Sequence, residues 1–262
     1  PQNPSTKGAV SIVRSDNEKF GMEFTWSVWI YVEDTTFDDN TKHKHIFHKG
    51  NQARNPNEDG IYYSHDEENM LRGYAMIVGR EDTLYSHGYY FFTFDFPEEY
   101  PFIPPKVTFY QPDRSTRFHP NLYVSGKVCL SVLNTWNGPG WSSCESIKSV
   151  LLQLVSILDK EPFLREPGVK REHPSYNIYH EIIKFKNVEV SVCDMIPEER
   201  LLLSPFHGFY PILKNIFLEN KEKIVEYVKK IQSESKYDTK NITLSGPYRL
   251  CETKINYNLV LE

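Results

Sequence analysis

The chain has 262 residues, enough for one large domain or for a domain of about 150 residues with extensions. Hydrophobic residues make up 39% of it, charged residues 25%, and 17 Tyr with 16 Phe make it rich in aromatic side chains. This composition favours a globular, sheet-containing protein over a disordered chain. The formal net charge of -5 arises from mixed signs without a basic stripe, so we expect protein partners and no nucleic acid.

The four cysteines are widely spaced and form no CxxC pair: Cys129, Cys144, Cys193 and Cys251. This spacing argues against a zinc ribbon, a thioredoxin-type motif and a disulfide framework, and it favours a reducing compartment. No run of 18 apolar residues and no charged-then-apolar leader occurs, so we expect neither a membrane span nor a signal peptide. The sequence predicts an intracellular protein of the cytoplasm or nucleus, and Pro1 in place of Met suggests a piece of something longer.

Residues 1–60 alternate short apolar runs with polar turns, which predicts strands. The clearest run covers residues 24–32. Side-chain types that bind metals gather downstream of it: Asp38, Asp39, His43, His45 and His48. Their spacing without a cysteine is a weak metal signature, and we favour a solvated loop leading into a strand. We therefore expect no metal and no other cofactor.

Three candidate strands follow at residues 74–79, 89–96 and 106–111, with the spacing of an antiparallel meander. The proline-rich stretch 96–105 excludes a strand across the second gap. In the middle strand Phe92, Phe94 and Phe96 alternate with other residues, so one face of the sheet is aromatic and should pack on another element.

The strongest helical pattern covers residues 142–160, where apolar residues recur at three- and four-residue steps. Ser142 and Glu145 form a candidate capping box, and Pro162 marks the stop. Residues 180–190 and 212–231 also have helical character. We interpret the charge-rich run within the latter as a solvated face.

Residues 117–130 lie between the meander and the long helix and show no strong helix or strand periodicity. Loops of this kind often carry chemistry. Asn121 precedes Cys129 by eight residues, and Ser125-Gly126 can fold the chain back so that the two approach each other. A thiolate can take up an acyl group as a thioester, and an amide N–H can stabilise the oxyanion that forms when an amine attacks it. A lone cysteine is otherwise more often an inert, buried thiol.

The order of the motifs reverses that preference. Residues 61–202 carry an ordered set of motifs that is similar to the signature of ubiquitin-conjugating (E2) enzymes. The set is Tyr-Pro-Phe-x-Pro-Pro-Lys-Val at 100–107, His-Pro-Asn at 119–121 and Cys-Leu at 129–130, followed by a Trp and a capped helix. Four further segments resemble the large, divergent Z type of that family: 126–131, 135–142, 166–168 and 192–195.

The resemblance implies an α+β protein with the ubiquitin-conjugating (UBC) fold, in which an antiparallel meander sheet packs on helices. We expect this core at residues 61–204, between a β-rich extension at 1–60 and a helical extension at 205–262. The same resemblance implies an activating enzyme, ubiquitin or a ubiquitin-like protein, and a ligase as partners in an ATP-dependent pathway.

Site roles follow from the resemblance position by position. It implies Cys129 as the nucleophile that forms the thioester, Asn121 as oxyanion or loop stabiliser, and His119 and Pro120 as structural parts of the same loop. Glu166 matches the acid that faces the acceptor lysine, although Glu161 and Asp159 are close in sequence. Phe102 matches an exposed aromatic that docks on ligases. The alternative for Phe102 is a buried aromatic of the meander.

Two departures from the family pattern concern its contacts with partners. Nothing in residues 1–60 has the pattern of the basic amphipathic helix that binds activating enzymes in the family. The step that usually reads Ser-Pro-Ala is Ser142-Ser143-Cys144 here. Both surfaces should therefore differ from those of standard members.

Alternatives to a transferase remain open. Residues 23–51 resemble the opening strands of laminin-G-type lectin sandwiches but are too short to complete one, which leaves a lectin-like adaptor as one reading. A catalytically idle scaffold that binds modifier or ligase is another, which the presence of both Cys129 and Asn121 disfavours.

Overall fold

The computed structural model describes residues 60–110, 112–202, 204–244 and 252–261. All of these lie in one compact unit that covers residues 56–262. The strands expected before residue 60, the aspartate and histidine cluster at 38–48 and the lectin-like segment 23–51 fall outside the described residues.

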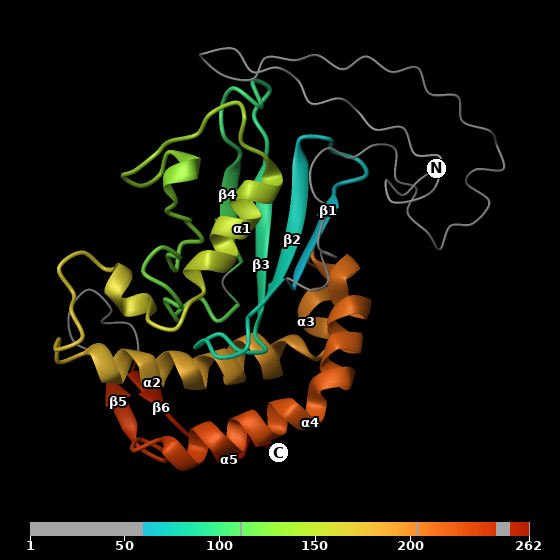
Figure 1. Cartoon of the computed structure of the whole chain (residues 1–262). Coiled ribbons are helices and arrows are strands. Elements are labelled where there is room, and N and C mark those ends of the chain that lie inside the picture. Colours follow the sequence, from blue (N-terminus) through green and yellow to red (C-terminus); the bar gives the residue numbers. More distant parts are fainter. Residues whose placement is uncertain (1–59, 111, 203, 245–251, 262) are drawn as a thin grey trace, which may run out of the picture. The chain divides into compact units, whose positions relative to one another are not determined.

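A four-stranded antiparallel sheet forms the centre of the described structure (Figure 1). Its strands are β1 (Ile61–His65), β2 (Arg72–Val78), β3 (Tyr89–Asp95) and β4 (Lys106–Phe109), in the spatial order β1-β2-β3-β4. The expected meander is confirmed. The sequence pattern missed β1, whose side chains are mostly half-buried and show no clear alternation.

Both faces of the sheet are buried. On one face Phe92, Phe94 and Phe96 pack into the main core, as their alternation predicts, together with Val150 and Leu154 of α1. On the opposite face a second core contains Phe91 and Met76, and residues that come much later in the chain cover it: Met195, Leu201, Phe206, Phe209 and Leu213. The sheet is thus the middle layer of three.

The helix over the first face is shorter than its apolar pattern predicts. It is α1 (Ile147–Ile157), and its N-cap is Ser146, whose side chain pairs with Ser149 in a capping box. The expected cap at Ser142 is wrong, because residues 142–145 form a turn in which the Glu145 N–H donates to the Ser142 carbonyl. A 3-10 turn at Pro162–Arg165 follows α1.

The second half of the described chain is mainly helical. It contains α2 (Tyr176–Lys186), which continues as a π-helical segment (Asn187–Val192), then α3 (Glu199–Leu202) and α4 (Tyr210–Glu234). The helix α2 begins and ends earlier than the predicted segment 180–190, and α4 extends beyond the predicted segment 212–231 at both ends. A small hairpin, β5 (Asn241–Thr243) with β6 (Glu252–Lys254), and α5 (Tyr257–Leu261) complete it.

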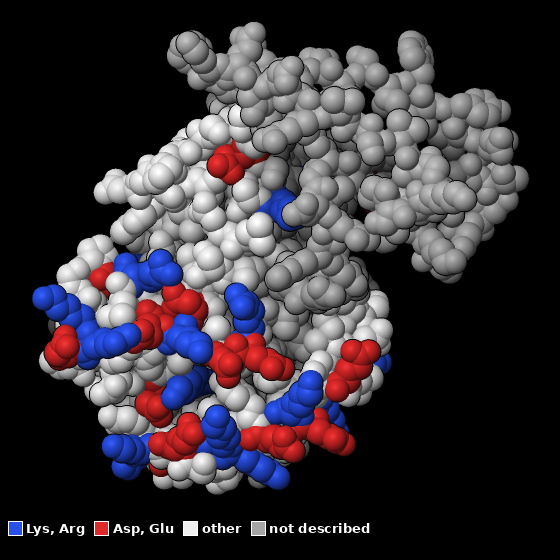
Figure 2. All heavy atoms as spheres, in the orientation of Figure 1, with Lys and Arg blue, Asp and Glu red and all other residues white. Residues whose placement is uncertain are grey.

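Figure 2 shows one face of the molecule, on which Lys and Arg side chains interleave with Asp and Glu over the region of α2 and α4. The region in front of the sheet carries few charges in this view. Within the described residues, none of the helices combines the length and the apolar character needed to cross a membrane.

Candidate active site

The segment that carries Cys129 folds back on itself as the sequence predicts. The Cys129 N–H donates to the Asn121 carbonyl (2.9 Å), and Leu122 pairs with Val128 in an antiparallel bridge. Gly126 closes the turn with φ of +86°, a conformation that favours glycine. A Cβ there would lie 2.9 Å from the Phe109 carbonyl oxygen of β4, so this position holds the hairpin close to the sheet edge.

Asn121 is held against the backbone of Cys129. Its side-chain Nδ2 donates to the Cys129 carbonyl oxygen at 2.7 Å. In this conformation the amide stabilises the loop, and it has one further N–H on the same nitrogen. Of the two roles that the resemblance implies for Asn121, the geometry therefore supports loop stabilisation directly.

His119 is fully buried and supports the start of the hairpin. Its Nδ1 accepts the Asn121 N–H at 2.9 Å. Burial, reinforced by the positive charges of Arg165 and Arg117, lowers the pKa of His119 to about 3. The imidazole is therefore neutral at pH 7, which suits a hydrogen-bond acceptor in the scaffold and not a proton donor.

Thr135 fixes the backbone on both sides of Cys129. Its hydroxyl accepts the Leu130 N–H at 2.9 Å and lies 2.9 Å from the Val128 carbonyl oxygen, to which it donates. Cys129 itself is only 2% exposed. The thiol thus sits in a segment that hydrogen bonds fix from two directions, with little access to solvent.

Three acidic side chains lie close together in sequence after α1, and their partners differ. Asp159 pairs with Arg165 (2.7 Å). Glu161 binds Arg171 and the Tyr176 hydroxyl, and these hydrogen bonds lower the pKa of Glu161 to about 2. Both carboxylates thus pair with residues that follow α1 in the chain.

Glu166 instead faces the hairpin that carries Cys129, through Arg117. The Arg117 guanidinium lies 4.0 Å from Glu166 Oε2, donates to the Pro120 carbonyl at 2.6 Å and covers the Tyr123 ring at 4.2 Å. Arg117 therefore joins the hairpin to the end of the Pro162–Arg165 turn. This contact links Glu166 to the hairpin that carries Cys129.

Phe102 lies in the β3–β4 connection with 79% of its surface exposed, so the alternative of a buried aromatic is wrong. The connection is anchored by Trp141, whose Nε1 donates to the Pro101 carbonyl at 2.7 Å. The replaced step Ser142-Ser143-Cys144 follows this Trp directly and is exposed.

A groove of about 510 Å³ runs between the start of β4 and the hairpin, with Pro104, Thr108 and Lys127 among its walls. Cys129 does not line it. The groove therefore lies beside the hairpin and not over the Cys129 side chain.

Comparison with known proteins places this arrangement in a family. A family model described as ubiquitin-conjugating enzyme matches residues 45–192, more than half of the chain. The chain belongs to the ubiquitin-conjugating enzyme family. The four-stranded sheet with its helices is accordingly the UBC fold in its α+β form.

The chain is similar to the Z type of this family. Ubiquitin-conjugating enzyme E2 Z of Homo sapiens is 40% identical over 164 residues, which are 61% of this chain and 45% of that protein. The E2 Z of Danio rerio is 39% identical over 164 residues, 61% of this chain and 49% of that protein. A more distant relative, probable ubiquitin-conjugating enzyme E2 23 of Arabidopsis thaliana, is 38% identical over 141 residues, 50% of this chain and 13% of that protein. The chain spans less than half the length of these relatives.

Two residues at the site were missed by reasoning from the sequence. Arg117 stands two positions before His119, and Thr135 directly precedes Trp136. The sequence motifs assign no role to either residue. Their hydrogen bonds form only when the hairpin folds against the segments before and after it.

Proposed function

We propose that this ubiquitin-conjugating enzyme carries ubiquitin or a ubiquitin-like protein as a thioester on Cys129 and passes it to a lysine amine or to a ligase. The modifier would come from an activating enzyme in an ATP-dependent pathway. The observation that carries the proposal is the hairpin in which Asn121 donates to the Cys129 carbonyl at 2.7 Å, supported by buried, neutral His119.

In the charging step the Cys129 thiolate attacks the thioester carbonyl of the modifier on the activating enzyme. The carbonyl–sulfur bond to that enzyme breaks, its thiolate leaves, and a new thioester forms on Cys129. In the transfer step a neutral amine attacks the same carbonyl and the carbonyl–sulfur bond to Cys129 breaks. An amide forms, the Cys129 sulfur leaves as the thiolate, and the nitrogen releases one proton to solvent. The chemistry needs no cofactor in this chain.

We assign the remaining roles around this reaction. Asn121 stabilises the loop and, through its second N–H, the oxyanion of the transfer step. Glu166 meets the incoming amine and favours its neutral, nucleophilic form, with Arg117 as the residue that holds it toward the hairpin. Phe102 contacts a ligase, as its exposure allows.

We further propose that the protein works in the cytoplasm or nucleus. Cys129, Cys144 and Cys193 are free thiols, a state that a reducing compartment preserves. The alternative function is an idle scaffold that binds modifier or ligase without chemistry, and it predicts binding in the absence of any thioester.

A charging assay separates the two functions. The chain is incubated with ATP, modifier and activating enzyme, and we expect a band that disappears on reduction. Cys129→Ala should abolish it, Cys129→Ser should give a band that resists thiol reductants, and Cys144→Ala is the matched control that should charge normally. Persistence of the reducible band in Cys129→Ala would contradict the proposal.

Glu166 is tested by measuring charging and discharge separately. We expect Glu166→Ala to slow transfer to free lysine much more than charging, because the acid acts only when the amine attacks. Glu161→Ala is the control acid, whose carboxylate is held by Arg171. An equal loss in both steps for Glu166→Ala would indicate a folding role.

A further inference from the structure

The groove between the start of β4 and the hairpin that carries Cys129, called here the β4 groove, has a wall from each of these two segments. Val128, the last residue of the hairpin wall, directly precedes Cys129 in the chain. A segment bound in the β4 groove therefore runs alongside the backbone that leads into Cys129. The lining consists of residues 104–108, residues 125–128, Leu133 and Thr135.

The outer edge of β4 offers a backbone donor to the β4 groove. The Phe109 N–H points away from β3 and donates to the Gly126 carbonyl at 2.8 Å, whereas the Tyr110 N–H donates to Phe91 of β3. Backbone N–H groups two residues apart in a strand point the same way, so the Val107 N–H turns to the groove that Val107 lines. Within the described residues no hydrogen bond of this N–H to the hairpin is found. It can therefore pair with the carbonyl of an added peptide segment.

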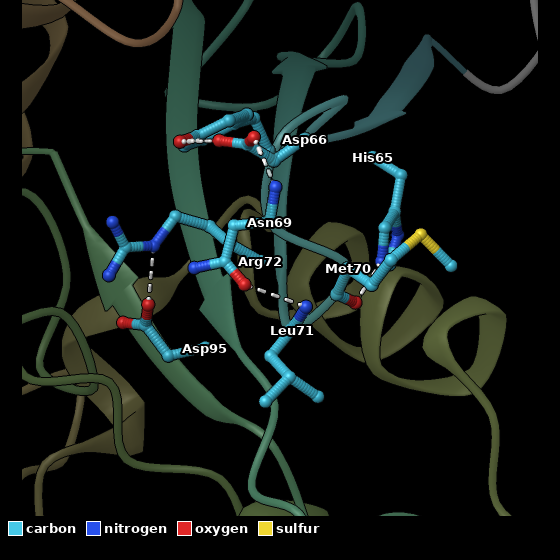
Figure 3. A network of polar contacts seen from close by, with 8 residues as sticks. His65, Asp66, Asn69, Met70, Leu71, Arg72 and Asp95 are labelled. Atoms are coloured by element: carbon cyan, nitrogen blue, oxygen red, sulfur yellow. Dashed lines mark hydrogen bonds and ion pairs between the residues drawn. The ribbon is translucent and has the colours of Figure 1, made fainter.

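The β4 groove carries two lysines and no acid. Lys106 lies directly opposite Asp95 in the register of β3 and β4, but Figure 3 shows that Asp95 is taken by Arg72, whose Nε donates to it at 2.8 Å. The other lysine is Lys127, whose ammonium lies 5.8 Å from the centroid of the Tyr123 ring. Both lysines are exposed, and neither forms an ion pair with any residue that the structure describes.

Of the molecules that meet at Cys129 in the transfer step, the acceptor is the one that needs such a groove. The modifier is already joined to Cys129 by a covalent bond, whereas the acceptor lysine arrives by diffusion and has to be aligned with the thioester. An extended segment fits the groove, because its backbone can pair with the Val107 N–H and its side chains alternate between two faces. Carboxylates on one face complement Lys106 and Lys127, and apolar atoms can lie on Leu133.

We propose that the β4 groove binds an extended, acidic segment of the acceptor protein next to its target lysine. The inference rests on the proposed function and adds a substrate class to it, namely lysines within acidic stretches of extended chain. The chain as a whole has a formal net charge of -5, so general attraction does not draw acidic acceptors to it. The two unpaired lysines of the groove supply the attraction locally, where the amine has to arrive.

The test is single-turnover discharge of the charged chain to synthetic acceptor peptides. Three peptides share one lysine and one uncharged frame, and they differ only in the residues that flank the lysine, which are glutamates, glutamines or arginines. The groove variants are Lys106→Glu with Lys127→Glu, and Lys127→Glu alone, which leaves the strand position opposite Asp95 unchanged. The matched control is Lys214→Glu with Lys221→Glu, at exposed lysines of α4. Discharge to hydroxylamine, a neutral nucleophile without flanking residues, is the reference reaction.

We expect the wild type to discharge to the glutamate peptide about fivefold faster than to the glutamine peptide, the size expected of two exposed ion pairs, and slowest to the arginine peptide. This preference should weaken between about 50 and 300 mM salt. The double groove variant should reverse the order and favour the arginine peptide, and Lys127→Glu alone should remove most of the preference. The control should keep the wild-type order, and all proteins should react equally with hydroxylamine.

Equal rates with the three peptides would overturn the proposal, and so would the wild-type order in both groove variants. Slower charging of the groove variants with an unchanged order of peptides would assign the groove to the modifier or the activating enzyme and overturn it too. An equal loss with peptides and hydroxylamine would reduce the lysines to a structural role. If the wild type forms no thioester with any activating enzyme, the proposed function fails and this inference falls with it. That result is distinct from normal charging followed by discharge that ignores peptide charge.

Discussion

Around Cys129 the backbone is fixed and the thiol is enclosed. Asn121 donates to the Cys129 carbonyl and Thr135 to the Val128 carbonyl, and only 2% of Cys129 is exposed. Enclosure of this kind limits reactions of the thiol with solutes in the folded protein.

Alkylation under native conditions tests this enclosure. We expect iodoacetamide to modify the exposed Cys144 on the order of tenfold faster than Cys129, because reactivity requires access as well as thiolate. Peptide mass spectrometry at successive times measures both rates in one sample. Urea serves as the control, since unfolding should bring the two rates together. Equal rates in the native protein would contradict the enclosure.

His119 predicts a pH dependence of stability. Its pKa is about 3 in the folded protein and about 6.5 in an unfolded chain. Between these values the unfolded state binds more protons, so the stability that neutral His119 contributes is present above pH 6.5 and is lost as the pH falls toward 3. The loss amounts to about 1.4 kcal/mol per pH unit at most.

The variant His119→Asn removes this titration and keeps an acceptor for the Asn121 N–H. We expect urea unfolding at several pH values to give a shallower loss of stability below pH 6.5 for the variant than for the wild type. Taking the difference between the two proteins removes the contribution of the other histidines. Parallel curves would contradict the assigned pKa.

At the scale of elements, the start of α1 is set by contacts that a helical pattern does not contain. Trp141 is held by Asn134, whose side chain accepts its N–H, and by Pro101. This fixes the chain direction through residues 142–145, so the first residue with cap geometry is Ser146. The pattern predicts a cap at Ser142, and contacts with residues distant in sequence place the cap at Ser146 instead.

Two single substitutions distinguish the caps. Ser146→Ala should destabilise the protein by about 1 kcal/mol, because it removes the acceptor for the Ser149 N–H. Ser142→Ala, at the cap that the sequence pattern favours, should change stability by less than about 0.5 kcal/mol. Unfolding midpoints in urea measure both. A larger effect at Ser142 would return the helix start to residue 142.

The sequence predicted those features that depend on local order and missed those that depend on distant partners. The meander, the Gly126 turn and the approach of Asn121 to Cys129 follow from alternation and spacing. The π-helical segment after α2 does not, because Asn187 is drawn out of the regular helix by the Tyr90 hydroxyl (2.5 Å) and the Ser86 carbonyl (2.8 Å), about a hundred residues earlier. Arg117 was missed for the same reason, because its partner Glu166 lies far along the chain.

At the scale of the whole molecule, the second face of the sheet is covered by the chain itself. Phe206 lies in the centre of this contact, 2% exposed, with its ring 5.2 Å from Phe91 and 5.4 Å from Tyr110. The second core is therefore formed jointly by the sheet and by residues that follow α2 in the chain. A sheet face that lost this cover would expose Met76 and Phe91 to water, at a cost that scales with apolar area.

This arrangement predicts that the sheet and the helices after residue 195 unfold together. Phe206→Ala should lower the free energy of unfolding by about 3–5 kcal/mol, as truncation of a buried Phe does, while Leu218→Ala on the exposed side of α4 should change it by less than about 0.5 kcal/mol. Urea titrations followed by tryptophan fluorescence and by circular dichroism are the measurement. In a background in which Trp26, Trp29 and Trp136 are replaced by Phe, Trp141 reports on the sheet side and circular dichroism mainly on the helices. Coincident curves with one midpoint then indicate a single cooperative unit. If Phe206→Ala lost its helical circular dichroism signal at a lower urea concentration than its fluorescence signal, the helices would unfold independently of the sheet. That result would contradict the prediction.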